Sequence, residues 1–309
     1  MESAGDNVFV NQGIEAALFD RMKDGEAALY LWRNANAVVI GRNQDAYAEC
    51  RVDALESDGG LLARRLSGGG AVWHDEGNLN FTFLAREKEA DKDKNFRIVL
   101  SALSALGINA ELGGRNDLYL NGAKSGGNAY FRRGGTVLHH GTLLVTTRRD
   151  AVARYLTPSE EKLESKAVKS VAARVAPLSD VLPDITVEAV SAALKAAFEA
   201  AYPGAEKRVL SPVELGAAEV IEKTGMFASD EWRYGKRGKY NVRVKTELFG
   251  ESAVLKARVV GGVTEEAEVF SDSLDADAVV AVNAALSGGD APASAREQAD
   301  RLLGELKNV

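Results

Sequence analysis

The residues with the clearest chemical potential lie in three polar segments. The first, residues 64–83, reads RRLSGGGAVWHDEGNLNFTF and brings together two arginines, three consecutive glycines, a histidine and two asparagines. The second is GRNDLYLNGAKSGGNAY at residues 114–130, and the third is HHGTLL at residues 139–144. Glycines let a backbone approach a ligand closely because they lack a Cβ atom. We therefore expect the three segments to contribute to one ligand site.

Lys124 is the strongest candidate for a group that acts on an anion. Glycines stand nearby at positions 122, 126 and 127, so we expect a flexible backbone and room for the ammonium group beside a buried ligand. A lone lysine is otherwise most often a solvated surface residue. Arg64 and Arg65 would bind a carboxylate or phosphate, or alternatively form surface salt bridges.

His140 and Asp117 each have two interpretations. His140 could orient a ligand, or it could be a core histidine whose nitrogens are hydrogen-bonded within the protein. Asp117 could hold a metal ion or a ligand amine, but the Asn116-Asp117 pair is also typical of a turn. The residue types alone do not decide between these interpretations.

Two standard phosphate-binding motifs do not match the glycine-rich segments. The glycines at 68–70 lack the later glycine of G-x-G-x-x-G. In the second segment Ala123 separates Gly122 from Lys124, whereas a P-loop joins glycine and lysine directly. A structural zinc site is not expected either, because the chain offers three histidines and a single cysteine, Cys50.

The apolar residues around the glycines indicate that a buried sheet carries them. Leu79, Phe81 and Phe83 alternate with polar residues on one side. Asn121-Gly122 predicts a hairpin turn. The predicted helices are residues 12–22, with Asn11 as N-cap, 95–106 and 185–202, and the predicted strands are 28–32, 37–41, 61–66, 79–84, 118–120 and 136–146. The polar segments thus lie at strand ends and turns.

The composition changes near residues 230–239, where aromatic residues and glycines stand among arginines and lysines. Beyond this point the pattern predicts a small α+β unit with strands at 242–248, 253–260 and 267–270 and helices at 276–286 and 295–306. Because 309 residues exceed one ordinary domain, we expect two domains, residues 1–235 and 236–309.

Composition and charge exclude several classes of protein. A net charge of -7 argues against a general nucleic-acid binder. The chain has no apolar run long enough for a bilayer and no secretory leader pattern, so we expect neither membrane insertion nor export. One cysteine fits a reducing cytoplasm.

Basic residues concentrate in one window, and the C-terminal part is acidic. The two sets are either ordinary solvated faces or, for the basic window, a docking surface for an acidic partner. The basic residues are Arg148, Arg149, Arg154, Lys162, Lys166, Lys169 and Arg174, and the acidic residues are Glu265, Glu266, Glu268, Asp272, Asp275 and Asp277.

Taken together, the motifs resemble the lipoate-protein ligase A family over nearly the whole chain. The second polar segment matches through its GRNDL at 114–118. Besides the three polar segments, the matching motifs are LYLWRN at 29–34, VVIGRNQ at 38–44, KLESKAVKSVAARV at 162–175 and VFSDSLDA at 269–276. The resemblance implies an α+β fold, in which a mixed sheet with flanking helices, related to biotin ligases and class II aminoacyl-tRNA synthetases, is followed by a small α+β domain.

The resemblance also implies an activity. The family uses ATP and Mg²⁺ to convert lipoate to lipoyl-AMP, and it then transfers the lipoyl group to a lysine of carrier domains, namely E2 subunits of 2-oxoacid dehydrogenases and the glycine cleavage H protein. Lys124 would be catalytic and touch both ATP and lipoate, and Asp117 would bind Mg²⁺. The implied binding residues are Arg64, Arg65, Ser67, Gly68, Gly69, Gly70, Ala71, Val72, Trp73, His74, Asn78, Asp117, Lys124, His140, Gly141 and Thr142.

The lysine segment departs from the family pattern in one respect. The order Lys124-Ser125-Gly126-Gly127 has one glycine more than family members usually carry there. We expect the extra glycine to loosen the lysine loop.

Three competing functions are compatible with the same core. An ATP-independent octanoyl or lipoyl transferase would need a cysteine thioester, for which Cys50 is the candidate, but we interpret Cys50 as a packed residue. A non-catalytic adenylate-binding module is the second possibility. A ligase that takes biotin as its substrate is the third.

Overall fold

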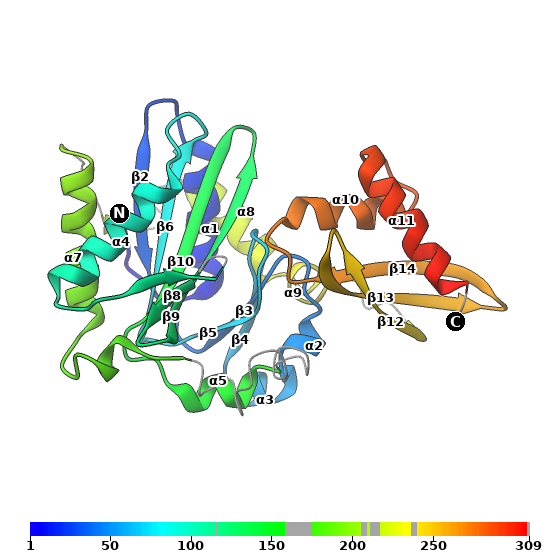
Figure 1. The fold of residues 1–309 in the computed structure, drawn as a ribbon, viewed down its shortest axis with the longest axis horizontal. Coiled ribbons are helices and arrows are strands. Elements are labelled where there is room, and N and C mark those ends of the chain that lie inside the picture. Colours follow the sequence, from blue (N-terminus) through cyan, green and yellow to red (C-terminus); the bar gives the residue numbers. More distant parts are fainter. Residues whose placement is uncertain (115–116, 158–174, 205–208, 211–216, 236–239, 308–309) are drawn as a thin grey trace.

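The computed structural model describes residues 1–114, 117–157, 175–204, 209–210, 217–235 and 240–307. Figure 1 shows a larger body formed by the N-terminal part and a smaller body formed by the C-terminal part beside it. Within the described ranges, every helix is either too short or too polar to cross a membrane.

A mixed eight-stranded sheet forms the centre of the larger body, with the strand order β11-β1-β2-β6-β10-β9-β8-β7. Strand β1 pairs in parallel with β2 and β11, and all other neighbours are antiparallel. The bounds are β1 Glu2–Ser3, β2 Ala27–Trp32, β6 Asn78–Arg86, β7 Glu111–Gly113, β8 Asp117–Leu120, β9 Ala123–Arg133, β10 Thr136–Leu144 and β11 Val209–Leu210.

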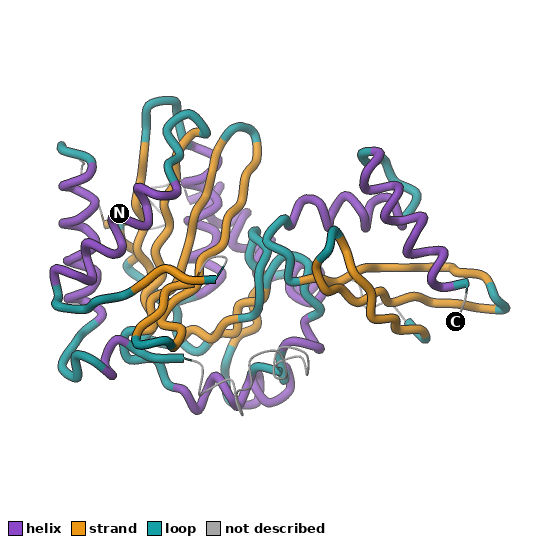
Figure 2. The backbone as a smooth tube through the Cα atoms, viewed as in Figure 1, coloured by secondary structure: helices purple, strands orange, loops and turns teal. Residues whose placement is uncertain are grey.

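Helices cover both faces of this sheet because its strands carry apolar residues on both sides. In β2, Leu29 and Leu31 belong to the core formed with α4 and α7, whereas Tyr30 and Trp32 belong to the core formed with α1 and α8. Successive strand residues point to opposite faces, which explains the division. The covering helices, seen in Figure 2, are α1 Val8–Arg21, α4 Lys92–Ala105, α7 Val187–Ala201 and α8 Ala217–Ala228.

A second sheet, of three strands, carries the glycine-rich segment. Strand β3 (Ala37–Ile40) pairs in parallel with β4 (Leu61–Arg64) and antiparallel with β5 (Val72–His74). Residues 65–71, called the glycine loop below, connect β4 to β5. The short helical segments of the larger body are α2 Ala46–Glu49, α3 Val52–Ser57, α5 Arg149–Tyr155, η2 Leu178–Asp180 and α9 Asp230–Tyr234.

The smaller body has its own apolar core. Leu255 of the sheet, Val279 of α10 and Leu302 of α11 are fully buried together in it. The sheet has the order β12-β13-β14 and is antiparallel. The bounds are β12 Val242–Leu248, β13 Glu251–Val260, β14 Val263–Ser271, α10 Ala276–Leu286 and α11 Ala293–Leu306. The division at residues 235 and 236 remains a prediction.

The predicted α+β fold with a mixed sheet and flanking helices is confirmed, with three differences in detail. The first helix begins at Val8 and is capped by Asn7, not by Asn11, which is buried inside the helix. Residues 123–133 form a strand where a glycine-rich loop was expected. Helix α8 was not predicted, because its apolar residues follow an irregular stretch without a clear start signal.

Candidate active site

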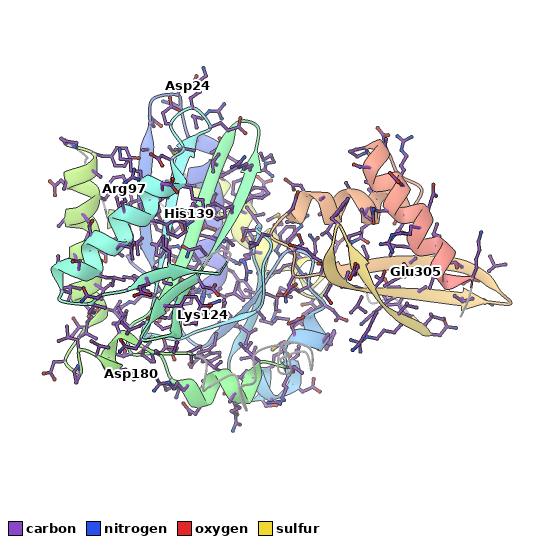
Figure 3. The ribbon with its side chains drawn as sticks, in the orientation of Figure 1. Asp24, Arg97, Lys124, His139, Asp180 and Glu305 are labelled. Carbon is purple, nitrogen blue, oxygen red and sulfur yellow. The ribbon has the colours of Figure 1, made fainter. Side chains whose placement is uncertain are left out.

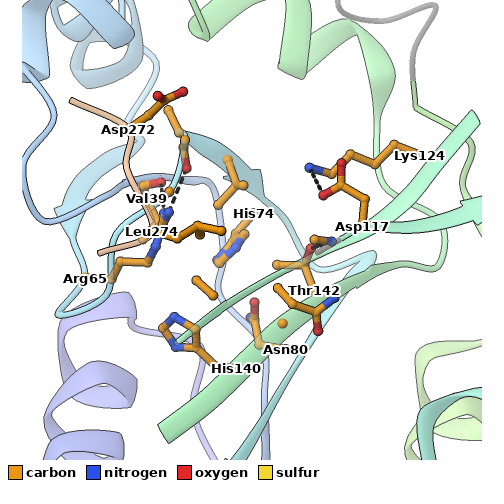
Figure 4. A pocket seen from close by; sticks show the side chains of 18 of the residues that line it. Val39, Arg65, His74, Asn80, Asp117, Lys124, His140, Thr142, Asp272 and Leu274 are labelled. Carbon is orange, nitrogen blue, oxygen red and sulfur yellow. Dashed lines mark hydrogen bonds and ion pairs between the residues drawn. The ribbon is translucent and has the colours of Figure 1, made fainter. Parts of the chain in front are cut away.

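A cavity of about 480 Å³ lies where the glycine loop faces strands β8, β9 and β10 (Figure 4). The Figure 4 view places Lys124 and Asp117 on one side, Arg65 and His140 on the other, and His74 between them. The predicted site residues that line the cavity are Arg65, Gly69, Gly70, Ala71, Val72, His74, Asp117, Lys124, His140, Gly141 and Thr142.

Lys124 lies on strand β9 of the larger body (Figure 3). Its Nζ is 2.8 Å from Oδ1 of Asp117 on β8, and the hydroxyl of Tyr119 donates to Oδ2 of Asp117 at 3.4 Å. The Lys124 and Asp117 side chains remain 38% and 24% exposed. This ion pair holds the ammonium group at the open side of the cavity, where an incoming anion could compete for it.

The glycines that follow Lys124 provide space rather than flexibility. A Cβ atom at Gly127 would lie 3.1 Å from Nζ of Lys124, so a side chain there would push the lysine away. A Cβ at Gly126 would overlap the carbonyl oxygen of Thr142 on the neighbouring strand. The expectation that an extra glycine loosens a lysine loop is therefore wrong: both glycines belong to β9 and permit close packing.

Arg65 fixes the shape of the glycine loop. Its guanidinium donates to Oγ of Ser67 and to the carbonyl oxygens of Gly68 and Gly70. A further bond runs to the carbonyl oxygen of Val39. Burial lowers the pKa of Arg65 to about 10, which leaves it charged at neutral pH. Its donors are thus engaged in holding the loop.

A buried polar chain connects helix α1 to the glycine loop. Oε1 of Glu15 accepts a hydrogen bond from the Thr82 hydroxyl at 2.6 Å and lies 2.9 Å from Nδ1 of His140. Nε2 of His140 is 2.6 Å from Oγ of Ser67. Glu15, His140 and Ser67 thus form one continuous chain of buried polar side chains between helix α1 and the glycine loop.

His74 is held by a second buried chain. Asn11 donates to Oδ1 of Asn34, and Nδ2 of Asn34 donates to Nδ1 of His74 at 2.9 Å. Burial, with a smaller contribution from the charge of Arg65, lowers the pKa of His74 to about 3. The ring is therefore neutral at physiological pH and carries its proton on Nε2, which lies in the cavity wall.

His139, the neighbour of His140, points away from the cavity and supports it indirectly. Its Nδ1 accepts from Asn95 and its Nε2 donates to Oδ1 of Asn128, which lines the cavity. Burial lowers the pKa of His139 to about 3. This histidine matches the core interpretation that the sequence left open for His140.

Five predicted site residues do not line the cavity. Arg64 donates to the carbonyl oxygens of Gly41, Arg42, Gln44, Trp232 and Arg233, so it ties β4 to its surroundings. The other four residues are buried in the protein behind the residues that line the cavity. Those residues are Ser67, Gly68, Trp73 and Asn78.

Several lining residues were not assigned from the sequence. Trp32 stands in a matched motif but received no role, and Gln12 reads as an ordinary helix residue. Asp272 and Leu274 lie about 200 residues from the glycine loop in sequence, and only the fold brings them to it. The unassigned lining residues are Gln12, Trp32, Val39, Asn80, Gly114, Tyr119, Gly127, Asn128, Ala129, Asp272 and Leu274.

The segment between β14 and α10 closes one wall of the cavity. The backbone N–H of Gly69 donates to the carbonyl oxygen of Ser273 at 3.1 Å. A Cβ atom at Gly68 would overlap that same oxygen, so this close approach requires glycine. Leu274 follows directly and lines the cavity. The smaller body therefore forms part of the site.

Cys50 lies outside the cavity lining and in a separate core. It is buried beside α3 and α5, and burial raises the pKa of its thiol to about 12. A thiol with such a pKa is a poor nucleophile at neutral pH. The interpretation of Cys50 as a packed residue agrees with this position.

The described arginines of the basic window are already paired with acids. Arg149 pairs with Asp180, Arg154 with Asp58, and the Arg148 guanidinium is 4.0 Å from Asp75. Lys162, Lys166, Lys169 and Arg174 lie outside the described residues.

Asp117 is the carboxylate nearest to Lys124 and the predicted Mg²⁺ ligand. Within the described ranges, no group of three His, Cys, Asp or Glu side chains is arranged to hold a metal ion. Mg²⁺ often uses one or two carboxylates together with substrate phosphates. Asp117, which lines the cavity, could supply one such carboxylate.

The geometry can be compared with proteins of known structure. The chain is similar to LipL1 of P. falciparum in complex with lipoate, with a TM-score of 0.78 and 29% identity over 92% of this chain and 88% of that one. It is also similar to a lipoate-protein ligase A bound with ATP, with a TM-score of 0.64 and 27% identity over 76% and 96% of the two chains.

Sequence comparisons agree with the structural ones. A lipoate-protein ligase A of Psychrobacter cryohalolentis is 36% identical over 286 residues, which cover 90% of this chain and 84% of that protein. Residues 7–199 match the lipoyl protein ligase A/B catalytic domain, so the match extends over more than half of the chain. The chain therefore belongs to the lipoyl protein ligase family.

Proposed function

We propose that this protein activates lipoate with ATP and transfers the lipoyl group to a lysine of a carrier domain. The observation that carries the proposal is the position of Lys124, whose ammonium group lies at the open side of a cavity with a buried opposite side. Relatives with bound ATP and with bound lipoate support both substrates.

In the first step, a carboxylate oxygen of lipoate bonds to the α-phosphorus of ATP, and pyrophosphate leaves. Negative groups meet in this step, so a nearby cation stabilises the transition state. Lys124 supplies that charge. When bound with the nucleotide, Mg²⁺ would neutralise further phosphate charge, and Asp117, which lines the cavity, would be its ligand.

In the second step, the amine of the carrier lysine attacks the acyl carbonyl and AMP leaves. The attacking amine must be neutral, but a lysine with a pKa near 10.4 is mostly protonated at pH 7. The charge of Lys124 would lower the pKa of an incoming lysine and polarise the carbonyl. The exposure of Lys124 agrees with this role, because the carrier must reach the acyl group from outside.

E2 lipoyl domains and the glycine cleavage H protein are the proposed carriers. A bipartite lipoate protein ligase of Thermoplasma acidophilum, studied with its E2 lipoyl domain, is 28% identical to this chain with a TM-score of 0.66. We assign carrier docking to the basic window, including Lys166 and Lys169. A cytoplasmic location is part of the proposal and fits the free thiol of Cys50.

The test is a mass-spectrometric assay of an E2 lipoyl domain incubated with lipoate, octanoate or biotin, with and without ATP. Lipoylation that requires ATP is the expected result. Acyl transfer that proceeds without ATP and is lost in Cys50→Ser would favour a transferase instead. Absence of any modification would favour a non-catalytic adenylate-binding module. In the same assay, charge reversal at Lys166 and Lys169 should raise the carrier KM and leave adenylate formation unchanged.

A further inference from the structure

Helix α1 buries three polar side chains beside the cavity, and one of them lacks a hydrogen bond. Asn11 donates to Asn34, and Glu15 bonds His140. Gln12 is 1% exposed and lines the cavity, yet neither its Nε2 nor its Oε1 has a partner among the described residues. A buried amide without hydrogen bonds destabilises a fold, so its presence in a cavity wall calls for a ligand partner.

His74 provides a second unpartnered group that lines the same cavity. Its Nδ1 is occupied by Asn34, and its Nε2 is buried and has no partner among the described residues. Since the ring is neutral, Nε2 presents an N–H donor without a positive charge. Gln12 and His74 can therefore donate to a weakly polar, uncharged group.

The surroundings of this pair disfavour a phosphate. The guanidinium of Arg65 is already bonded to the glycine loop, so it offers little to an anion. Trp32 and Val39 add apolar surface, and the Trp32 ring meets the His74 ring edge-on at 6.2 Å between centroids. The occupant that fits is mostly apolar and carries a weak hydrogen-bond acceptor.

We propose that Gln12 and His74 form a subsite for the sulfur-bearing end of the lipoyl chain and select lipoate over octanoate. This assignment rests on the proposed function. Ring sulfurs of lipoate are weak acceptors that can take N–H donors, whereas octanoate ends in a methyl group. A site with buried donors rejects an analogue that leaves them unpaired. Figure 4 shows His74 between the side of the cavity with Lys124 and the side with Arg65 and His140.

The test replaces the Gln12 amide by apolar side chains of similar size, in Gln12→Leu and Gln12→Met. Pyrophosphate release is measured for the full chain with lipoate and with octanoate, and the unfolding temperature is followed with each acid alone. Gln298→Leu, at a partly exposed position of α11, is the matched control. We expect the ratio of kcat/KM for lipoate over octanoate to fall about tenfold in both variants and to stay unchanged in the control.

Two further readouts separate recognition from a structural role. The ligand-free variants should unfold at the same or a higher temperature, because they no longer bury an amide without hydrogen bonds, which destabilises the folded state. In both variants, the rise in unfolding temperature that lipoate alone produces should become nearly as small as the rise that octanoate produces. A lower unfolding temperature with an unchanged selectivity ratio would instead show that Gln12 is a structural residue.

The remaining outcomes also decide the question. A raised KM for ATP with an unchanged acyl ratio would assign the pair to the adenine base and overturn the proposal. A wild-type chain that forms adenylate with both acids, and variants that keep its ratio, would overturn the subsite alone. A wild-type chain that adenylates neither acid would overturn the proposed function and this assignment with it.

Discussion

The two sides of the cavity differ in charge and in access to solvent. Lys124 and Asp117 are charged and partly exposed, whereas Gln12, His74 and His140 are buried. A charged group at an open side can meet phosphates and an incoming carrier lysine. A buried polar wall can instead read the shape and hydrogen bonding of a chain that stays inside. Under the proposed function, bond formation takes place at the charged group and substrate selection at the buried polar residues.

The largest expected effect concerns the charged side. Under the proposed function, Lys124→Ala removes the cation that stabilises charge at the α-phosphate, so kcat/KM for lipoylation should fall on the order of 10³-fold, or about 4 kcal/mol. The unfolding temperature should change little, because the side chain is partly exposed. Carrier modification measured by mass spectrometry gives the rate.

Lys88→Ala, at an exposed turn, is the control and should retain full activity. Transfer from preformed lipoyl-AMP should also slow in Lys124→Ala. If that transfer ran at the wild-type rate, Lys124 would act in adenylation only, and the carrier lysine would need another source of positive charge.

A smaller effect is expected at Gly68, where the segment between β14 and α10 closes one wall of the cavity. Gly68→Ala would push a methyl group into the Ser273 carbonyl and should destabilise the protein by about 2 kcal/mol. Gly70→Ala, in the same loop, meets no atom within 4 Å and should be nearly neutral. Urea unfolding of the ligand-free variants measures both. Equal losses would mean that the Gly68 contact is not the cause.

The smallest expected effect is a change of folding stability with pH, which arises from the buried His74. His74 has a pKa of about 3 when folded and about 6.5 when unfolded, so the unfolded chain binds more protons between these values. Stability from His74 is present above pH 6.5 and falls as the pH drops. Between pH 7.0 and 5.5 the loss should be about 1 kcal/mol.

His74→Gln should lose correspondingly less stability over this interval, as measured by urea unfolding at both pH values. Between pH 7 and 8 the wild type and the variant should respond alike, which serves as the internal control. An identical acid response of the two proteins below pH 6.5 would show that His74 is already protonated when folded.

Local patterns predicted the parts of the fold that depend on neighbouring residues. Alternation identified β6 around Phe81, and helical spacing identified α4 and α7. Strand β9 was missed because Gly126 and Gly127 resemble a loop in sequence. Tertiary contacts explain why both positions are glycine. Gly126 packs against the carbonyl oxygen of Thr142, and Gly127 leaves room for the side chain of Lys124.

The site was predictable where a motif is continuous and not where the wall is assembled from distant segments. The glycine loop and Lys124 were both singled out from the sequence. Arg64 was singled out with them, but its adjacency to Arg65 does not reveal that it bonds to backbone carbonyls. Leu274 could not be found in this way, because its approach to Gly69 depends on how the smaller body packs.

The bond between Gly69 and Ser273 also sets an order of events during synthesis. The glycine loop leaves the ribosome about 200 residues before its partner, which at 5–20 residues per second means a delay of roughly 10–40 s. For most of that interval, once residue 124 has emerged, the chain contains Lys124 and the polar residues of α1, but it lacks the wall that Leu274 completes. Under the proposed function, a nascent chain would therefore hold Lys124 well before it could enclose an adenylate, and enclosure would wait until the C-terminal quarter of the protein has been made.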